Sequence, residues 1–129
     1  MSENINVRSI VGTFLEHSRI FYFYNDGKEE VFMASADWMP RNLDKRVEIM
    51  FPVEDEVLKE EVKHILEIQL EDTLKAHVMN GEGVYEKVDK RGKKLLGAQS
   101  FFCEEAKKRA KKKNPVKAKR TFEPMMNPN

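Results

Sequence analysis

HSRIFYFYNDGKEEVFMASAD, residues 17–37, carries the clearest structural signal in this chain. Five apolar or aromatic residues follow Arg19 in succession, a composition typical of a buried β-strand. The cluster Asn25-Asp26-Gly27 then favours a tight turn, and residues 31–34 are apolar again, as in a returning strand. The stretch therefore predicts a β-hairpin over residues 18–35.

The segments on either side of the hairpin predict a helix before it and a third strand after it. Apolar residues recur at helical spacing near the start of the chain, which predicts an amphipathic helix over roughly residues 6–16. These residues are Val7, Ile10, Val11, Phe14 and Leu15. Residues 46–51, RVEIMF, have the composition of a strand, and Pro52 is expected to end it. The polar residues 35–45 predict a loop between the strands.

The second half of the chain predicts two helices and a short strand. Acidic residues 54–56 suit the positive end of a helix dipole, and apolar residues follow on one face through about residue 70. Residues 84–88 favour a short strand. Ser100 is a suitable cap for a last helix that has acids early and lysines late. Together these elements predict an α/β (α+β) fold with flanking helices around a central mixed sheet.

Length and composition restrict the class of protein. A chain of 129 residues is expected to form one domain, and its formal net charge is only +1. The charge is uneven, because residues 107–120 hold nine Lys and Arg and no acid. A single cysteine, Cys103, excludes an internal disulfide framework. No apolar stretch approaches the ~20 residues of a membrane span and no signal peptide is recognisable, so we expect a cytoplasmic protein.

His17 and Arg19 lie two positions apart where the predicted strand begins. Alternate residues of a strand face the same way, roughly 6.5 Å apart, so both side chains would project together. Histidine can carry a phosphoryl group or move a proton near neutral pH, and arginine offers a planar fork to phosphate oxygens. The pair indicates a phosphate site; the alternative is a surface histidine at a strand start.

Polar residues near the other two strands extend this pattern. Residues 35–37, Ser-Ala-Asp, are small enough to let a phosphate approach, and Arg41 follows them. Arg46 and Glu48 would share a face of the third strand, where Glu48 needs a cation as partner. The alternative is a loop of solvated charges with a structural ion pair. Trp38 is expected to be a packing residue, with stacking on a base as the other option.

The order of these residues resembles one half of the phospholipase D-type phosphotransfer fold. In that fold His-x-Lys is followed by a Gly-Ser-x-Asn segment and then by a glutamate. Here Arg19, Ser35, Asp37 and Glu48 stand at the positions of the lysine, serine, asparagine and glutamate. The segments SIVG, FLEHSR, SADWMPRN and LDKRVE resemble more closely the carboxy-terminal catalytic region of the long-chain polyphosphate kinases. This resemblance covers residues 2–55 and continues more loosely to residue 103.

The resemblance implies a phospholipase D-like domain over residues 1–106. The basic residues, the three prolines and the lack of periodicity predict a disordered tail over residues 107–129. The resemblance implies that His17 is the second active-site histidine of the family, which contacts the nucleotide and is proposed to give or take a proton. Arg19 would be the second cation of the phosphotransfer motif. The residues that would bind ATP or phosphate are His17, Arg19, Asp37, Arg41, Arg46 and Glu48. Thr13 stands where the family usually has a basic residue.

The resemblance also implies a reaction whose other parts lie elsewhere. The family transfers the terminal phosphoryl group of ATP reversibly to inorganic polyphosphate, through a phosphohistidine in a preceding domain that has no counterpart here. The Mg²⁺ that accompanies ATP is also expected outside this chain. We therefore expect the chain to be truncated at its amino terminus, to be inactive alone and to act with the remaining polyphosphate kinase domains. A homo-oligomer, and a separate gene product in place of a fragment, stay open.

Two other functions are open. A phospholipase D-like phosphodiesterase could act as a homodimer in which each chain donates one His-x-Arg pair. A non-enzymatic module could bind polyanions through residues 107–120 with a steep salt dependence, although such a run can also be a solubilising tail. His64 and His77 lie outside every motif, and we expect both to be solvated.

Overall fold

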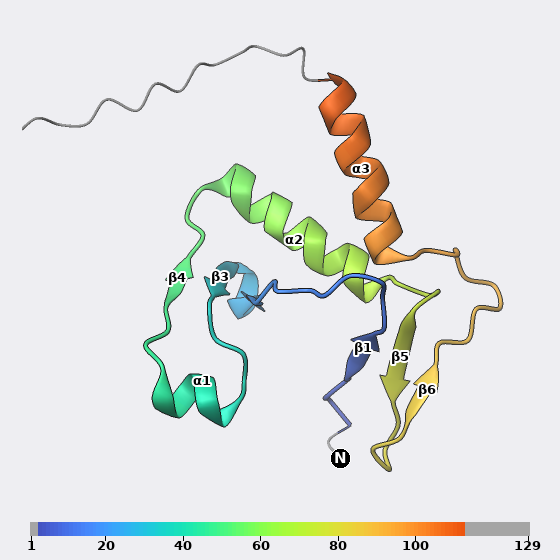
Figure 1. Ribbon diagram of the computed structural model, residues 1–129, viewed down its shortest axis with the longest axis horizontal. Helices are drawn as coiled ribbons and strands as arrows, with labels where there is room; N and C mark the ends of the chain where they lie inside the picture. Colours follow the sequence, from blue (N-terminus) through green and yellow to red (C-terminus); the bar gives the residue numbers. More distant parts are fainter. Residues whose placement is uncertain (1–2, 113–129) are drawn as a thin grey trace, which may run out of the picture.

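The computed structural model describes residues 3–112, which form two small sheets and three α-helices (Figure 1). The strands are β1 Arg8–Ile10, β2 Ile20–Phe23, β3 Glu30–Ala34, β4 Met50–Pro52, β5 Ala76–Met79 and β6 Tyr85–Lys87. The helices are α1 Pro40–Lys45, α2 Glu56–Leu70 and α3 Ala98–Lys112, with a short 3-10 helix at Asn25–Gly27. This mixture of elements confirms the predicted α+β class.

The strands form two separate antiparallel sheets, in the orders β1-β5-β6 and β2-β3-β4. The sequence predicts one central mixed sheet; apolar patterns mark strands but do not state which strands pair, and this accounts for the difference. Helix α2 joins the two sheets. It contacts β2 and β3, and its last residue, Leu70, accepts a hydrogen bond from the Arg8 side chain of β1.

The predicted hairpin is confirmed. Ile20 pairs with Met33 and Phe23 with Glu30 across β2 and β3. The three turn residues that follow Tyr24 all have positive φ, at 49°, 53° and 85°. Asn, Asp and Gly tolerate this left-handed backbone better than other residues, so the turn cluster in the sequence has a direct conformational cause.

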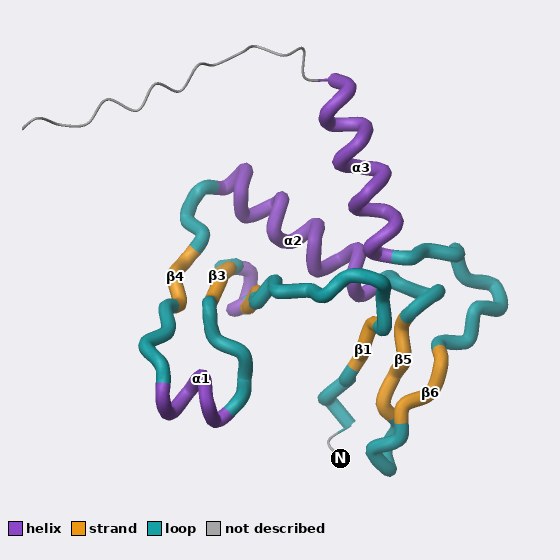
Figure 2. The backbone as a smooth tube through the Cα atoms, viewed as in Figure 1, coloured by secondary structure: helices purple, strands orange, loops and turns teal. Residues whose placement is uncertain are grey.

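The helix predicted over residues 6–16 is wrong. Residues 8–10 form β1 and pair with β5, with Arg8 opposite Val78 and Ile10 opposite Ala76. The pairing continues when Val11 N donates to Lys75 O at 3.1 Å. Valine and isoleucine favour a strand when a partner strand is available, and local spacing does not reveal that partner. Residues 11–19 then cross as an extended loop from β1 to β2, below α2 in Figure 2.

The region between β3 and α2 also differs from the prediction. The predicted loop contains α1, which begins with Pro40 at its first helical position, where the missing N–H costs nothing. The predicted strand over residues 46–51 shortens to β4, because Arg46 directly follows α1 and the chain needs residues 47–49 to reach the sheet. Pro52 ends β4, and it is tolerated because β4 is an edge strand.

The two long helices begin at carboxylate caps. The predicted helix α2 is confirmed, and the Asp55 side chain accepts from Val57 N and Leu58 N at its start. Helix α3 begins at Ala98, two positions before the predicted cap Ser100. Its first amide donates to Asp72 Oδ2 at 2.7 Å, so the cap comes from a distant residue. Helix α3 continues through Lys112, so the predicted disordered tail is wrong for residues 107–112, which are helical; residues 113–129 lie outside the described residues.

Few apolar residues between positions 3 and 112 are buried. They are Val31, Val62, Ile68, Ala76, Val88, Leu96 and Ala98. Three of them, Ile68, Leu96 and Ala98, form a cluster against which Ile10, Phe101 and Phe102 pack. Many large apolar residues are exposed instead, among them Trp38 and Val47. Within residues 3–112, no helix has both the length and the apolar character needed to cross a bilayer.

Candidate functional site

Arg19 connects the start of β2 with the segment that follows β3. Its carbonyl oxygen accepts from Ala34 N at 2.9 Å, which extends the hairpin pairing by one residue. Its Nε donates to Asp37 Oδ1 at 2.7 Å, and its Nη1 donates to the carbonyl oxygen of His17 at 3.1 Å. The guanidinium is therefore held on two sides, and 23% of the side chain is exposed.

The charges around Arg19 reinforce one another. The hydrogen bond and charge of Asp37 raise the pKa of Arg19, and the charge of Glu48 adds to this. In return, the Arg19 guanidinium holds the pKa of Asp37 below its usual value, with smaller contributions from a hydrogen bond of Asn42 and from His17. Arg19 and Asp37 are therefore both charged at neutral pH, with Glu48 and His17 within electrostatic reach.

His17 is exposed and lies in the extended loop rather than in a strand. Strand β2 begins at Ile20, so strand alternation does not determine where the imidazole points. The two residues are still neighbours, because the Arg19 side chain turns back to the His17 carbonyl. Next to them, Ser18 Oγ donates to Glu16 Oε2 at 2.9 Å. The result is an exposed histidine whose backbone is hydrogen-bonded to a fixed cation.

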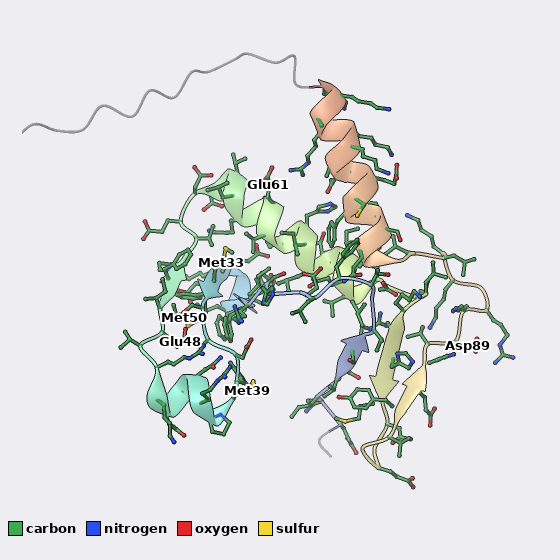
Figure 3. All side chains as sticks on the ribbon, viewed as in Figure 1. Met33, Met39, Glu48, Met50, Glu61 and Asp89 are labelled. Carbon is green, nitrogen blue, oxygen red and sulfur yellow. The ribbon has the colours of Figure 1, made fainter. Side chains whose placement is uncertain are left out.

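Ser35 ties the end of β3 to the residues that lead into β4. Its N donates to Ile49 O at 3.0 Å, and its Oγ accepts from Ile49 N at 3.0 Å. The same hydroxyl donates to Glu48 Oε2, so the direct partner of Glu48 is a serine and not the predicted cation. Figure 3 labels Glu48, which lies on the stretch between α1 and β4, and Met50, the first residue of β4.

Arg41 and Arg46 lie at the two ends of α1, and both are exposed. Within residues 3–112, neither makes an ion pair or a side-chain hydrogen bond to the group around Arg19. The predicted shared strand face of Arg46 and Glu48 is wrong, because both residues precede β4. The structure thus brings His17, Arg19 and Asp37 together, with Glu48 nearby. It places Arg41 and Arg46 at the two ends of α1.

Residues 1–99 match a family profile described as Polyphosphate kinase C-terminal domain 2. This chain belongs to the polyphosphate kinase family. It is 39% identical over 132 residues to the polyphosphate kinase of Lactiplantibacillus plantarum, and 52% identical over 92 residues to that of Pseudomonas aeruginosa. The two alignments cover 99% and 71% of this chain, but 18% and 13% of the relatives.

The fold is shared with a solved polyphosphate kinase. The crystal structure of the enzyme from Porphyromonas gingivalis superposes with a TM-score of 0.77 at 41% sequence identity. The match covers 86% of this chain and 17% of that chain. The chain therefore spans less than a fifth of the length of these relatives, and the family inferred from the sequence motifs is confirmed.

The site offers an anion better partners than it offers a metal ion. Residues 3–112 contain no group of three or more His, Cys, Asp or Glu side chains placed to hold a metal. The two acids of the site are already engaged, Asp37 by Arg19 and Glu48 by Ser35. Residues 3–112 therefore do not offer a set of ligands for the Mg²⁺ that polyphosphate kinases are expected to use with ATP.

Two residues of this polyphosphate kinase segment differ from their sequence interpretation. Asn42 was not singled out, yet it is buried and its side chain helps to lower the pKa of Asp37. The one signal in the sequence for this role is that Asn42 is a polar residue two positions after Pro40, which starts the helix. Trp38 was expected to be a packing residue; its ring stacks on Phe21 with 6.0 Å between centroids, but the residue is 80% exposed.

The other histidines lie away from the site. His64 is half-buried between α2 and α3, with its ring 5.9 Å from Phe101 and its Nε2 3.3 Å from Glu105 Oε1. His77 is half-buried in β5. The prediction that both are solvated is therefore wrong, because helix α3 and the β1-β5-β6 sheet cover positions that the sequence leaves open.

Proposed function

We propose that this chain forms one wall of the active-site cleft of a polyphosphate kinase. The enzyme would transfer the terminal phosphoryl group of ATP reversibly to inorganic polyphosphate, through a phosphohistidine outside this chain. The observation that supports this most strongly is the Arg19 guanidinium, which is fixed by Asp37 and by the backbone carbonyl of the exposed residue His17. The names of the matching relatives support the same reaction.

Arg19 would bind phosphate oxygens of the nucleotide or of polyphosphate. Its Nε and Nη1 are held by Asp37 and by the His17 carbonyl, and no protein group within residues 3–112 bonds to its Nη2. A guanidinium fixed in this way has already lost rotamer freedom, so less entropy is lost when an anion binds. Arg41 and Arg46, both exposed at the ends of α1, would add positive charge that attracts a polyanion.

His17 would contact the nucleotide and move a proton. An imidazole can donate to a phosphate oxygen or accept a proton from it near neutral pH, and His17 is exposed, with its backbone carbonyl bonded to Arg19. Asp37 and Glu48 would not touch the phosphate, which repels carboxylates. Asp37 would orient Arg19, and Glu48 would hold the segment after β3 through Ser35.

The remaining parts of the reaction would come from outside this chain. Magnesium bound with ATP neutralises charge on the phosphate oxygens when it is present, and we place its ligands elsewhere in the enzyme. Exposed apolar residues around α1 would pack against other polyphosphate kinase domains or a second copy of the chain. They are Trp38, Met39, Leu43, Val47 and Ile49. A cytoplasmic location fits this assignment and stays a prediction.

A chimeric enzyme tests the proposal. The chain replaces the matching segment of the Pseudomonas aeruginosa polyphosphate kinase, and ADP formation is followed with ATP, magnesium and polyphosphate. We expect the chimera to be active, the isolated chain to be inactive, and H17A to lower kcat of the chimera by about 100-fold or more. H64Q is the matched control and should stay near the chimera's rate. An active chimera that H17A does not slow would overturn the assignment of His17.

A second candidate function is polyanion binding by the end of α3. Lys107 is paired with Glu104 at 2.7 Å and Arg109 reaches Glu61 at 3.3 Å, but the later lysines are exposed and form no ion pair within residues 3–112. The homodimeric phosphodiesterase has less support. Its motif needs Lys and Asn at the positions of Arg19 and Asp37, and these two side chains bind each other here.

A further inference from the structure

The side chain of Gln99 holds the loop that carries His17. Its Oε1 accepts from Thr13 N at 2.8 Å and from Phe14 N at 3.0 Å, and its Nε2 donates to Phe14 O at 2.7 Å. One amide group thus pairs with the backbone of two consecutive loop residues, as a neighbouring strand would. Thr13 and Phe14 lie beyond β1, which ends at Ile10, so they do not pair with a strand.

Gly12 makes room for this contact. A Cβ atom built on Gly12 would lie 2.2 Å from Gln99 Oε1 and 2.4 Å from its Cδ, far closer than van der Waals contact. Any other residue at position 12 would therefore displace the Gln99 side chain. The space requirement and the three hydrogen bonds are separate observations that point to the same pair of residues.

Gln99 is itself fixed to the core. It follows Ala98, whose amide donates to the buried Asp72 at 2.7 Å. Asp72 also accepts from Lys75 N and Ala76 N at the start of β5, the strand that pairs with β1. The loop is therefore held to a hydrogen-bonded junction between α3 and the β1-β5-β6 sheet.

The loop is held at two places, and His17 lies between them. One is the Gln99 contact at Thr13 and Phe14, and the other is Arg19, fixed by Ala34 N and Asp37. Between these points, the described side-chain bonding is local, from Ser18 to Glu16 and from Arg19 to the His17 carbonyl. Without Gln99, the preceding fixed residue would be Val11, which bonds to Lys75 O. The unsupported span around His17 would become much longer.

We propose that Gln99 is a positioning residue that, together with Gly12, holds the loop so that His17 stays beside Arg19. This inference rests on the proposed phosphate-binding role of His17 for its functional meaning. The hold on the loop itself is a structural property that can be measured without any ligand.

The first test measures loop motion in the whole 129-residue chain. In Q99A, amide hydrogen exchange at Thr13 and Phe14 should be about five-fold faster or more, and the ¹⁵N order parameter of His17 should fall from about 0.85 towards 0.6. Q69A is the matched control, because Gln69 lies on α2 and its side chain bonds to no loop residue within residues 3–112. Unchanged exchange or an unchanged order parameter in Q99A would overturn the proposal.

A second variant approaches the same contact from the other side. G12A should loosen the loop as Q99A does, and the double variant should be no looser than Q99A alone, because both changes break one contact. Independent, additive effects would contradict the pairing of these residues. Q99E keeps the oxygen that accepts from Thr13 N and Phe14 N but loses the donor to Phe14 O, so it should fall between wild type and Q99A. G12A and Q99E decide the question even if Q99A does not fold.

The last experiment separates the role of the Gln99 contact from the proposed function. Inorganic tripolyphosphate is titrated into wild type, Q69A and Q99A while the His17 signal is followed by NMR. We expect a dissociation constant at least three-fold higher in Q99A, with the amide signals of α2 unchanged, a combination that a general loss of structure would not give. If wild type does not bind, the proposed function fails, whereas the exchange and relaxation results still decide the role of Gln99.

Discussion

Replacing Asp72 by alanine should remove an anchor that joins two parts of the fold. Oδ1 accepts from Lys75 N at 2.7 Å and Ala76 N at 3.1 Å, and Oδ2 accepts from Ala98 N at 2.7 Å. The residue is fully buried, with 0% of its surface exposed. In the D72A variant, the start of β5 and the start of α3 would lose their shared acceptor, and three donor groups would have no replacement.

The size of the loss follows from these three bonds. A hydrogen bond to a charged group contributes about 1.5–3 kcal/mol, and burying the carboxylate offsets part of the sum. We therefore expect D72A to lower the free energy of unfolding by ~3–5 kcal/mol, a large fraction of the stability of a small domain. D72N keeps one acceptor oxygen but places an amide N–H₂ group opposite one of the donors, so its loss should be intermediate.

Urea unfolding followed by circular dichroism measures these differences. The control is D89A, because Asp89 is exposed and pairs with Arg91 in the same loop. Its unfolding midpoint should match wild type. A loss below about 1 kcal/mol in D72A would refute the reasoning, since three charge-assisted bonds to a buried carboxylate cannot be that weak together.

Two further substitutions test local electrostatics. Lys63 and then Tyr22 hydrogen-bond to Glu29 and lower its pKa below 4.5, so this contact stabilises the fold fully above pH 4.5 and loses its effect as pH falls through the lowered value. E29Q should therefore flatten the acid limb of stability against pH, measured by thermal unfolding from pH 2 to pH 7; an unchanged limb would contradict the linkage. The double variant K108Q/K111Q should weaken tripolyphosphate binding and reduce its salt dependence if α3 binds polyanions. Isothermal titration at two salt concentrations would measure this, and equal slopes in both proteins would exclude α3 as the site.

The parts of the fold that the sequence predicts well are those with local causes. The turn after Tyr24 needs positive φ at three consecutive residues, and Asn-Asp-Gly is a composition that allows it. Helix α2 starts at Asp55, whose side chain accepts from the next amides along the chain. In both cases the residues that decide the structure are neighbours in the sequence.

The parts that the sequence does not predict depend on distant partners. Residues 8–10 have apolar spacing that fits a helix, but they become β1 because β5 offers a pairing edge. Helix α3 begins at Ala98 because of the buried Asp72, which no nearby motif indicates. The contact between Gly12 and Gln99 likewise joins residues from opposite ends of the domain.

In the candidate site, too, features with local causes were predicted and features that depend on distant residues were not. The motif order groups His17 with Arg19 and Asp37, and the structure joins Arg19 to the His17 carbonyl and to Asp37. Arg46 and Glu48 were grouped by strand alternation, and that grouping fails because α1 ends just before them and β4 starts later. The role of Asn42 depends on the turn of α1 towards Asp37, a tertiary feature that residue type alone does not carry.

The most direct test of the account is whether phosphate binds at His17. The chain has three histidines, so their imidazole signals can be assigned by three single substitutions and followed during titration with ADP or tripolyphosphate. The account predicts that the His17 signal shifts in a saturable way, that R19Q abolishes the shift, and that His64 and His77 stay unchanged. No shift at His17, or an equal shift at all three histidines, would contradict a phosphate site built around His17 and Arg19.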